Sequence, residues 1–256
     1  MGGRIISLIR ETSGIELSGA LERGGHPAVA KDAGIFAAIG AIGIPITSRI
    51  EDIIGSADVV IDFTTAEASL ENLRAVSTAK KAMVIGSTGF TPGQMEQVKE
   101  YCKDIPCVLS PNMSVGVNVM LKVLHDTAKI LGDEYDVEIV EAHHRLKKDA
   151  PSGTAMKMAQ VLADALGRDL DEVGVYARHG IMGERGKKEI GIQTVRAGDI
   201  IGDHTVMFGG MGERLEFTHR AHTRDNFARG AVRAALWVAG KKPGFYDMQD
   251  VLGLKS

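Results

Sequence analysis

Between residues 15 and 110, short apolar runs alternate with amphipathic helical patterns, and this alternation constrains the fold more than any other feature. Four runs are typical of strands: Ile15–Leu21, Ala57–Phe63, Ala82–Ile85 and Pro106–Leu109. Between them, the segments Glu67–Lys80 and Thr91–Lys103 have helical periodicity, the second with Thr91 as N-cap and Pro92 in its first turn. Because strands separated by crossover helices form right-handed βαβ units, the sequence predicts an α/β fold with a doubly wound, Rossmann-like parallel sheet.

The start of the chain departs from this pattern. A dinucleotide-binding sheet begins with a strand and a glycine-rich loop, but Arg4–Arg10 already has the pattern of the following helix. Gly2 can match only the last glycine of a G-x-x-G-x-x-G loop. We therefore expect the first, central strand to be missing, leaving a slot in the core. We also expect either a reading frame that begins about 15 residues upstream or a truncated form that binds its cofactor poorly.

The pattern changes near residue 114. A long amphipathic helix is expected over Ser114–Leu131, and another begins near Thr154. Alternating segments then predict strands over Lys188–Arg196, Asp199–Phe208 and Arg214–His222. We expect a dinucleotide-binding domain of residues 1–114 and 224–256 and an α+β substrate-binding and oligomerisation domain of residues 115–223 with a mixed sheet. The helix Asn226–Ala239 returns to the first domain.

Composition narrows the possible partners. The net charge is −3 and the pI is near 6.2, which gives no support for a nucleic-acid partner. No apolar run is long enough to span a bilayer, so no membrane partner is expected. Cys102 and Cys107 are the only cysteines, too few for a disulfide scaffold, and a reducing cytoplasm fits best.

The segment Glu141–Thr154, with the sequence EAHHRLKKDAPSGT, combines proton donors with a possible anion site. His143 and His144 precede Lys147 by four and three residues, so one helical turn or a tight loop brings these side chains together. Histidine exchanges protons near neutral pH, and lysine supplies a compact positive charge. The Pro-Ser-Gly-Thr turn opens a helix, whose first N–H groups suit a carboxylate or phosphate.

Simpler interpretations of the same segment stay open at this point. A basic run is commonly a solvated face, and Ser152 or Thr154 is commonly only an N-cap. The paired histidines could bind a metal, but no third ligand lies at a recognisable spacing, so we expect no metal.

Glu22 and Arg23, at the end of the second expected strand, suit an adenosine ribose and its 2′-phosphate, but in isolation they are better explained as an exposed charged turn.

The whole string resembles the signature of the dihydrodipicolinate reductase family, E-x-H-H-x-x-K-x-D-A-P-S-G-T. Further matches are distributed along nearly the whole chain: Gly19–Arg23, Asp62–Thr64, Val84–Phe90, Asn112–Met120, Gly183–Arg185, Thr194–Asp199, Gly212–Glu216 and Ala231–Trp237. The resemblance departs from the family at the absent amino terminus and at Ser87, where the family often has threonine.

This resemblance implies an NADPH- or NADH-dependent oxidoreductase that reduces 4-hydroxy-tetrahydrodipicolinate, a small dicarboxylate, in diaminopimelate and lysine biosynthesis. It implies His143 as the proton donor and acceptor and Lys147 as the second proton donor. It also implies a cytoplasmic homotetramer joined through the substrate domain's sheet. The implied substrate-binding residues are His144, Gly153, Thr154 and Arg224. The implied cofactor-binding residues are Gly2, Glu22, Arg23, Gly86, Ser87, Thr88, Ser110, Pro111, Asn112 and Met113.

Two alternatives stay open from the sequence. One is a nicotinamide oxidoreductase acting on another dicarboxylate or imino acid. The other is a non-catalytic binding or assembly protein left by loss of the amino terminus.

Overall fold

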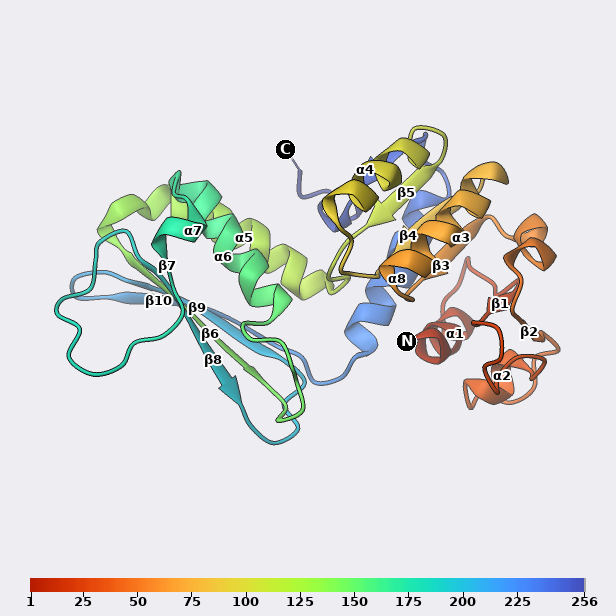
Figure 1. Cartoon of the computed structure of the whole chain (residues 1–256), viewed down its shortest axis with the longest axis horizontal. Helices are drawn as coiled ribbons and strands as arrows, with labels where there is room; N and C mark the ends of the chain where they lie inside the picture. The colour runs from red at the N-terminus through yellow and green to blue at the C-terminus, as the bar shows by residue number, and fades with distance from the viewer. Residues whose placement is uncertain (256) are drawn as a thin grey trace. The chain divides into compact units, whose positions relative to one another are not determined.

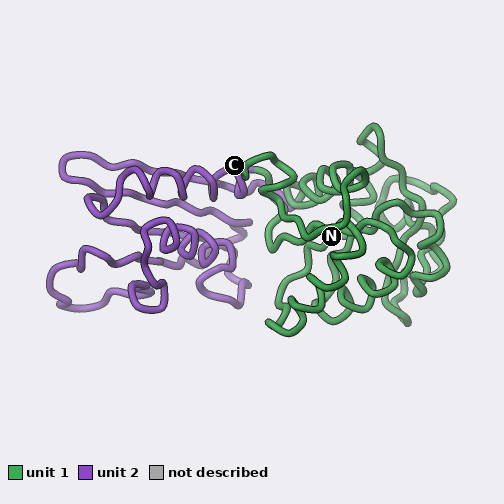
Figure 2. The backbone as a smooth tube through the Cα atoms, turned by 90° about the horizontal axis from the view of Figure 1, so that it is seen from above, with its two compact units in different colours: residues 1–115, 225–256 green, residues 116–224 purple. Residues whose placement is uncertain are grey.

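The computed structural model describes residues 1–255, which form two compact units (Figure 2). Unit 1 comprises residues 1–115 and 225–255, and unit 2 comprises residues 116–224. Each boundary lies one residue from the domain boundary expected from the sequence. No helix within residues 1–255 combines the length and the apolar character needed to cross a bilayer.

The main sheet of unit 1 is parallel and has the strand order β11-β5-β4-β3 (Figure 1). Its strands are β3 (Val59–Asp62), β4 (Ala82–Ile85), β5 (Pro106–Leu109) and β11 (Gly244–Tyr246). Its helices are α3 (Ala66–Thr78), α4 (Pro92–Tyr101), α8 (Asp225–Val238) and α9 (Met248–Val251). Val84 of β4 belongs to the apolar cluster with α8, whereas its neighbours Met83 and Ile85 belong to the cluster with α3 and α4. Because successive strand residues face opposite sides, helices cover both faces, as in a doubly wound fold.

A second, smaller piece of parallel sheet in unit 1 pairs β1 (Ala20–Leu21) with β2 (Ile46–Thr47). Within residues 1–255 this pair shares no ladder with β3, so unit 1 contains two separate pieces of parallel sheet. Helix α1 (Gly2–Glu11) packs against both pieces, because Ile6 belongs to the cluster beside β2 and Ile9 to the cluster that contacts Ile61 of β3. The predicted α/β fold with a Rossmann-like parallel sheet is confirmed.

The predicted strand Ile15–Leu21 is wrong over most of its length, because only Ala20 and Leu21 pair with a neighbour. A strand exists only where another strand bonds to it, and no strand lies beside Ile15–Gly19 among the described residues. Instead, Ile15 and Leu17 pack as apolar side chains against α1.

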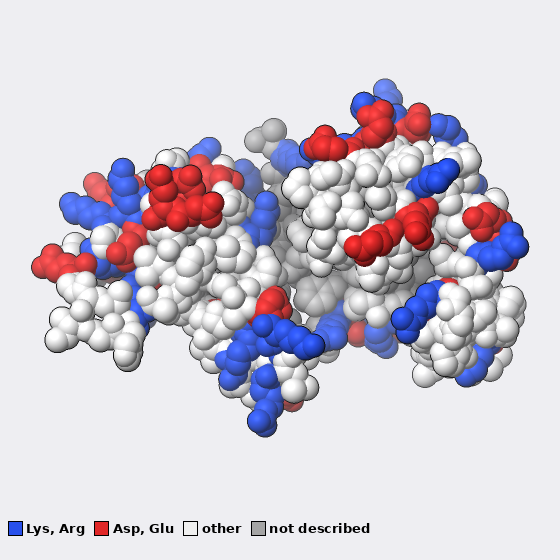
Figure 3. Space-filling model, in the orientation of Figure 1, with Lys and Arg blue, Asp and Glu red and all other residues white. Residues whose placement is uncertain are grey.

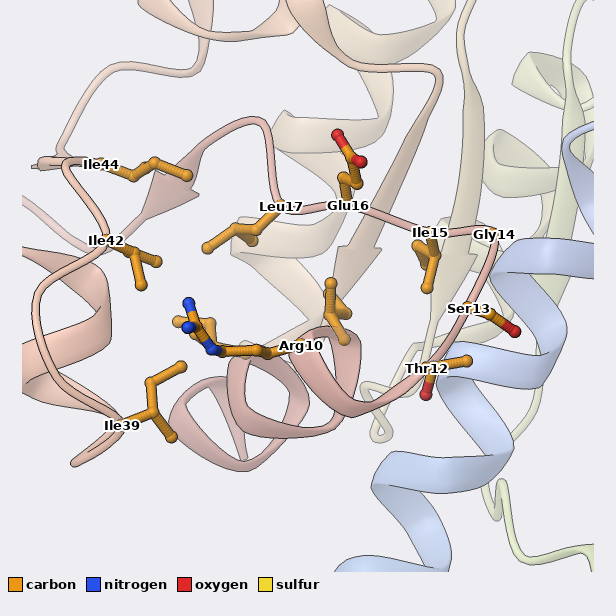
Figure 4. A pocket seen from close by; sticks show the side chains of 12 residues that line it. Arg10, Thr12, Ser13, Gly14, Ile15, Glu16, Leu17, Ile39, Ile42 and Ile44 are labelled. Carbon is orange, nitrogen blue, oxygen red and sulfur yellow. The ribbon is translucent and has the colours of Figure 1, made fainter.

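A groove of about 580 Å³ lies beside this segment (Figure 4). It is lined by α1, by residues 12–17 and by three isoleucines in the segment before β2, Ile39, Ile42 and Ile44. The Arg10 side chain reaches from α1 toward these isoleucines (Figure 4). None of the predicted site residues lines the groove.

Unit 2 consists of one mixed sheet, in the order β10-β9-β6-β8-β7, with two long helices (Figure 1). The strands are β6 (Asp136–His143), β7 (Gly174–Val175), β8 (Ile190–Arg196), β9 (Asp203–Gly209) and β10 (Arg214–Arg220), and the helices are α5 (Val115–Leu131) and α6 (Gly153–Leu166). β8 runs parallel to β6, whereas β9 is antiparallel to it. Leu124 and Leu162 of the helices form one core with Ile139 and Phe208 of the sheet.

Several short elements complete the two units: α2 (Ala33–Phe36), α7 (Leu170–Val173) and the 3-10 turns Ile50–Asp52, Ile54–Ser56 and Gly132–Glu134. The expected strand Asp199–Phe208 begins later than predicted, at Asp203, because the residues before it form the turn that follows β8.

Candidate active site

The candidate active site in unit 2 begins on β6, whose alternate residues face the core. Val137 and Ile139 are buried in the apolar core, and the same inward row continues through Glu141 and His143. Strand geometry therefore directs a carboxylate and an imidazole into the interior at the carboxyl end of β6. Buried polar side chains of this kind need partners, since an unpaired one costs about 1–3 kcal/mol.

Glu141 is fully buried, and its carboxylate accepts hydrogen bonds from four residues of unit 2. His143 Nδ1 lies 2.6 Å from Oε2, and both terminal nitrogens of Arg196 on β8 lie 2.9 Å from the two oxygens. The backbone N–H of Ser152 donates to Oε1 at 2.9 Å. Burial by itself raises the pKa of Glu141, but the hydrogen bonds from Arg196, His143 and Ser152 outweigh it and lower the pKa. Glu141 is therefore a carboxylate at neutral pH.

The His143 ring lies between this carboxylate and a second histidine. His204 of β9 is edge-on to it with 5.1 Å between the ring centroids, and its Nε2 lies 2.9 Å from Ser152 Oγ. Burial lowers the pKa of His143, although Glu141 opposes that shift. Burial also lowers the pKa of His204 to about 4, so His204 is neutral at pH 7. On the far side of the His143 ring, a Cβ added to Gly202 would lie 3.0 Å from Nε2, so the glycine leaves room there.

Lys147 lies in the tight turn that follows β6, where its backbone N–H bonds to the His144 carbonyl at 3.1 Å. Of the two expected arrangements, the loop and not a helical turn brings Lys147 near His143. Its Nζ pairs with both Asp149 oxygens at 2.8 Å, and this hydrogen bond lowers the pKa of Asp149. This loop contains Arg145, Lys147 and Lys148. Figure 3 shows positively charged side chains gathered over it. His144 is half-buried at the start of this loop.

The turn after this basic loop opens α6. Ser152 is its N-cap, with Oγ accepting the Ala155 N–H, so the cap interpretation of Ser152 is confirmed. Gly153 is exposed at the first helical position, where a Cβ would meet no atom within 4 Å, and Thr154 follows it half-buried. An α-helix leaves its first N–H groups without helical partners, which makes this end a place for an anion. Arg224 is exposed beyond β10, at the end of unit 2.

In unit 1, the expected cofactor residues follow the carboxyl ends of parallel strands. Glu22 and Arg23 come directly after β1, and the Glu22 carboxylate accepts the Arg23 backbone N–H at 2.8 Å. Gly2 is the exposed first residue of α1. Ser110–Met113 follows β5, with Ser110 Oγ bonded to the Asn112 carbonyl at 2.8 Å and Pro111 exposed.

The loop Gly86–Thr88 follows β4 and is tied to a buried carboxylate. Ser87 Oγ lies 3.2 Å from Asp62 Oδ1 and accepts the Thr64 N–H at 2.9 Å. Asp62 also accepts bonds from Ser69 and Asn72 of α3, each at 2.7 Å. The Ser87 hydroxyl is therefore engaged within unit 1, while Thr88 beside it is exposed.

Sequence reasoning assigned no role to Arg196, His204 or Asp62, although Asp62 and Arg196 fall within segments that match the family. Arg196 is placed opposite His143 only by the parallel register of β6 and β8, which no local pattern reveals. Among residues 1–255, no group of three or more His, Cys, Asp or Glu side chains is placed to hold a metal ion.

Comparisons with known proteins match nearly the whole chain to one family. Residues 1–113 match the family model described as dihydrodipicolinate reductase, N-terminus, and residues 116–252 match the one described as dihydrodipicolinate reductase, C-terminus. The 4-hydroxy-tetrahydrodipicolinate reductase of Syntrophus aciditrophicus is 60% identical over 256 residues, covering 100% of this chain and 96% of the relative. The enzyme of the same name from Geotalea daltonii is 63% identical over 255 residues, with the same two coverages.

Among solved structures, a dipicolinate-bound dihydrodipicolinate reductase from Paenisporosarcina sp. TG-14 aligns with a TM-score of 0.74 and 24% identity over 97% of this chain and 94% of that chain. An amine dehydrogenase from Mycobacterium smegmatis aligns with a TM-score of 0.57 and 13% identity over 95% of this chain and 91% of that chain. These two alignments bear on the fold alone. The two family models and the 60% identity of full-length relatives carry the assignment: this chain belongs to the dihydrodipicolinate reductase family.

Proposed function

We propose that this chain catalyses the NADPH- or NADH-dependent reduction of 4-hydroxy-tetrahydrodipicolinate to tetrahydrodipicolinate, in the diaminopimelate route to lysine. Relatives with the corresponding reductase name, 60% identical over the entire chain, support this proposal. In the structure, the main support is the contact of 2.6 Å between His143 Nδ1 and Glu141 Oε2, beside the loop that contains Lys147. This arrangement supplies a positioned proton donor next to cationic groups that attract a dicarboxylate.

The reaction replaces the 4-hydroxyl by hydrogen, so one water leaves and one hydride and one proton are added. The nicotinamide cofactor supplies the hydride when it is bound. Negative charge then develops on the ring, and a positioned acid must neutralise it. We assign that proton donation to His143, through Nε2, because Nδ1 is held by Glu141. Lys147 is the second proton donor: a proton that it gives to the departing hydroxyl is balanced by the one that the neighbouring ring carbon loses on dehydration, so the net uptake stays one proton. Its pairing with Asp149 holds the ammonium group in the loop until substrate binds.

Two carboxylates of the substrate need positive partners. We assign them to His144, to the start of α6 at Gly153 and Thr154, and to Arg224. The exposed Gly153 at the helix N-terminus supports this role, since N–H groups there point along the helix axis toward an anion.

For the cofactor, the chemistry of the residues present fits a nicotinamide dinucleotide. Glu22 at the end of β1 suits ribose hydroxyls, and the exposed Arg23 suits a 2′-phosphate, so this pair accepts both NADH and NADPH. Gly2 at the start of α1 offers a helix N-terminus to the pyrophosphate. The loops Gly86–Thr88 and Ser110–Met113 complete the site at the carboxyl ends of β4 and β5.

We propose a cytoplasmic homotetramer joined through the sheet of unit 2. Strand β10 is exposed along most of its length, and Leu215 on it is 41% exposed, which suits pairing with another copy. Light scattering should give a mass near four times the 27.3 kDa of one chain. Leu215→Glu should lower that mass, whereas Ile130→Glu on the exposed side of α5 should leave it unchanged. A monomeric parent chain would contradict the proposal.

The decisive test is oxidation of NADPH and NADH by the purified chain with freshly generated 4-hydroxy-tetrahydrodipicolinate. We expect substrate-dependent loss of absorbance at the nicotinamide band with both cofactors. Turnover of another imino dicarboxylate, with none of this substrate, would favour a different nicotinamide oxidoreductase. Binding of pyridine-2,6-dicarboxylate without any turnover would favour a non-catalytic binding protein.

A further inference from the structure

The buried Glu141 carboxylate is more heavily bonded than an ion pair with His143 requires. Besides the histidine, it accepts two hydrogen bonds from Arg196, one from the Ser152 N–H and one from Thr194 Oγ1 at 3.2 Å. These five donors outnumber the roughly four lone-pair sites of a carboxylate, so no bonding capacity is left over. The side chain is thereby fixed in one orientation and held in its ionised form.

Arg196 connects that carboxylate to the loop that carries Lys147. The guanidinium binds Glu141 through two nitrogens, and its Nη2 also donates to the Asp149 carbonyl at 2.6 Å. A planar guanidinium suits such forked bonding, whereas lysine has no equivalent geometry. One side chain thus links the end of β6, the end of β8 and the loop after β6.

The charged and titratable groups in and around this site come from four strands and one loop. Glu141 lies on β6, Lys147 on the following loop, Arg196 on β8 and His204 on β9, with His219 of β10 interacting with His204. Burial lowers the pKa of His143, the Glu141 carboxylate raises it, and the charges of Lys147 and Arg196 lower it. His204, with its pKa near 4, adds no charge at neutral pH. Burial and two cations therefore lower the pKa of His143, and one anion opposes them.

We propose that Glu141 and Arg196 are positioning residues for His143: Glu141 holds the Nδ1 side of the ring, so that Nε2 exchanges the proton with substrate, and Arg196 fixes Glu141. A neutral imidazole has one N–H, and a carboxylate 2.6 Å from Nδ1 selects the tautomer with hydrogen there. Nε2 is then directed toward Gly202, whose lack of a side chain leaves room in front of that nitrogen. The inference rests on the proposed catalytic role of His143, but the ring's orientation and titration can be tested without measuring activity.

The test is an NMR titration of histidine-labelled protein, with the His143 signal assigned by its loss in His143→Gln. In the unmodified protein, nitrogen shifts should show hydrogen on Nδ1. Glu141→Gln removes the anion and should move the His143 titration to lower pH. Arg196→Gln removes an opposing cation and should move it to higher pH. Arg145→Gln, the same change at an exposed residue of the neighbouring loop, should leave the titration in place.

Opposite shifts in the two variants separate this proposal from a merely structural role, which predicts no such reversal. If either variant fails to fold, Glu141→Asp, which retracts the carboxylate, should also lower the titration, and Arg196→Lys should shift it less than Arg196→Gln. Shifts in the same direction, unchanged titrations, or hydrogen on Nε2 in the unmodified protein would overturn the inference. If the titrations move as expected while the pH profile of kcat/KM does not follow, the positioning is supported and His143 loses its proposed catalytic role.

Discussion

His143→Gln and Lys147→Ala should each lower kcat by about 10²–10⁴-fold, the usual contribution of one positioned general acid. Glutamine cannot donate a proton of suitable acidity, but its amide can still hydrogen bond to Glu141, so the buried carboxylate keeps a partner. Alanine at position 147 removes the ammonium group and leaves the exposed Asp149 side chain in water. Steady-state turnover with saturating cofactor and freshly made substrate measures both effects.

The matched control for the lysine is its neighbour in the chain. Lys148 is exposed in the same loop, and Lys148→Ala should keep kcat within about twofold of the parent, as expected of a surface charge outside the proposed site. Near-parental turnover of either His143→Gln or Lys147→Ala would remove that residue from the proposed chemistry. A similar loss in Lys148→Ala would instead point to a general effect of loop charge.

Gly230→Ala should lower the free energy of unfolding by about 3 kcal/mol, at the upper end of the usual range for overpacking. Gly230 lies in α8, and a Cβ there would be 1.7 Å from the Met113 carbonyl oxygen. The obstacle is backbone, so the helix or the Ser110–Met113 loop has to shift. Because that loop belongs to the proposed cofactor site, affinity for NADPH should fall as well. Denaturant unfolding and cofactor titration measure the two effects.

A glycine without such a neighbour provides the comparison. Gly93 in α4 has no atom within 4 Å of an added Cβ, so Gly93→Ala should leave stability unchanged or raise it by roughly 0.5–1 kcal/mol, the helical preference of alanine. If Gly230→Ala unfolded at the same denaturant concentration as the parent, the close contact between α8 and the loop would not exist in solution.

The elements that could be predicted from sequence are those whose signals are local. Helix α4 has its N-cap Thr91 and its Pro92 in adjacent positions, and β4 is a fully buried apolar run that ends at Ile85, directly before Gly86. The failures depend on distant partners. Ile15–Gly19 has the composition of a strand but lacks a pairing neighbour, and β11 was missed because its three residues become a strand only beside β5.

The same distinction holds for the site. His143 and Lys147 lie in one short segment whose residue types are typical of proton transfer, so the sequence alone could identify them as candidates. Glu141 belongs to the same motif, but the sequence alone did not indicate its role. Its burial and its hydrogen bonds follow from its place among the inward-facing residues of β6. Arg196 lies 55 residues further along the chain and reaches Glu141 through the parallel pairing of β6 with β8. No spacing rule links such residues before the sheet is known.

Every hydrogen bond to Glu141 comes from residues of unit 2. The ring orientation of His143 and its electrostatic surroundings are therefore established when this unit folds, and not anew in each catalytic cycle. The conformational entropy lost in ordering these side chains belongs to the folding equilibrium, where the core of the unit offsets it. In its proposed role as proton donor, His143 would therefore add little reorganisation to the reaction barrier, which is the advantage of a preorganised site.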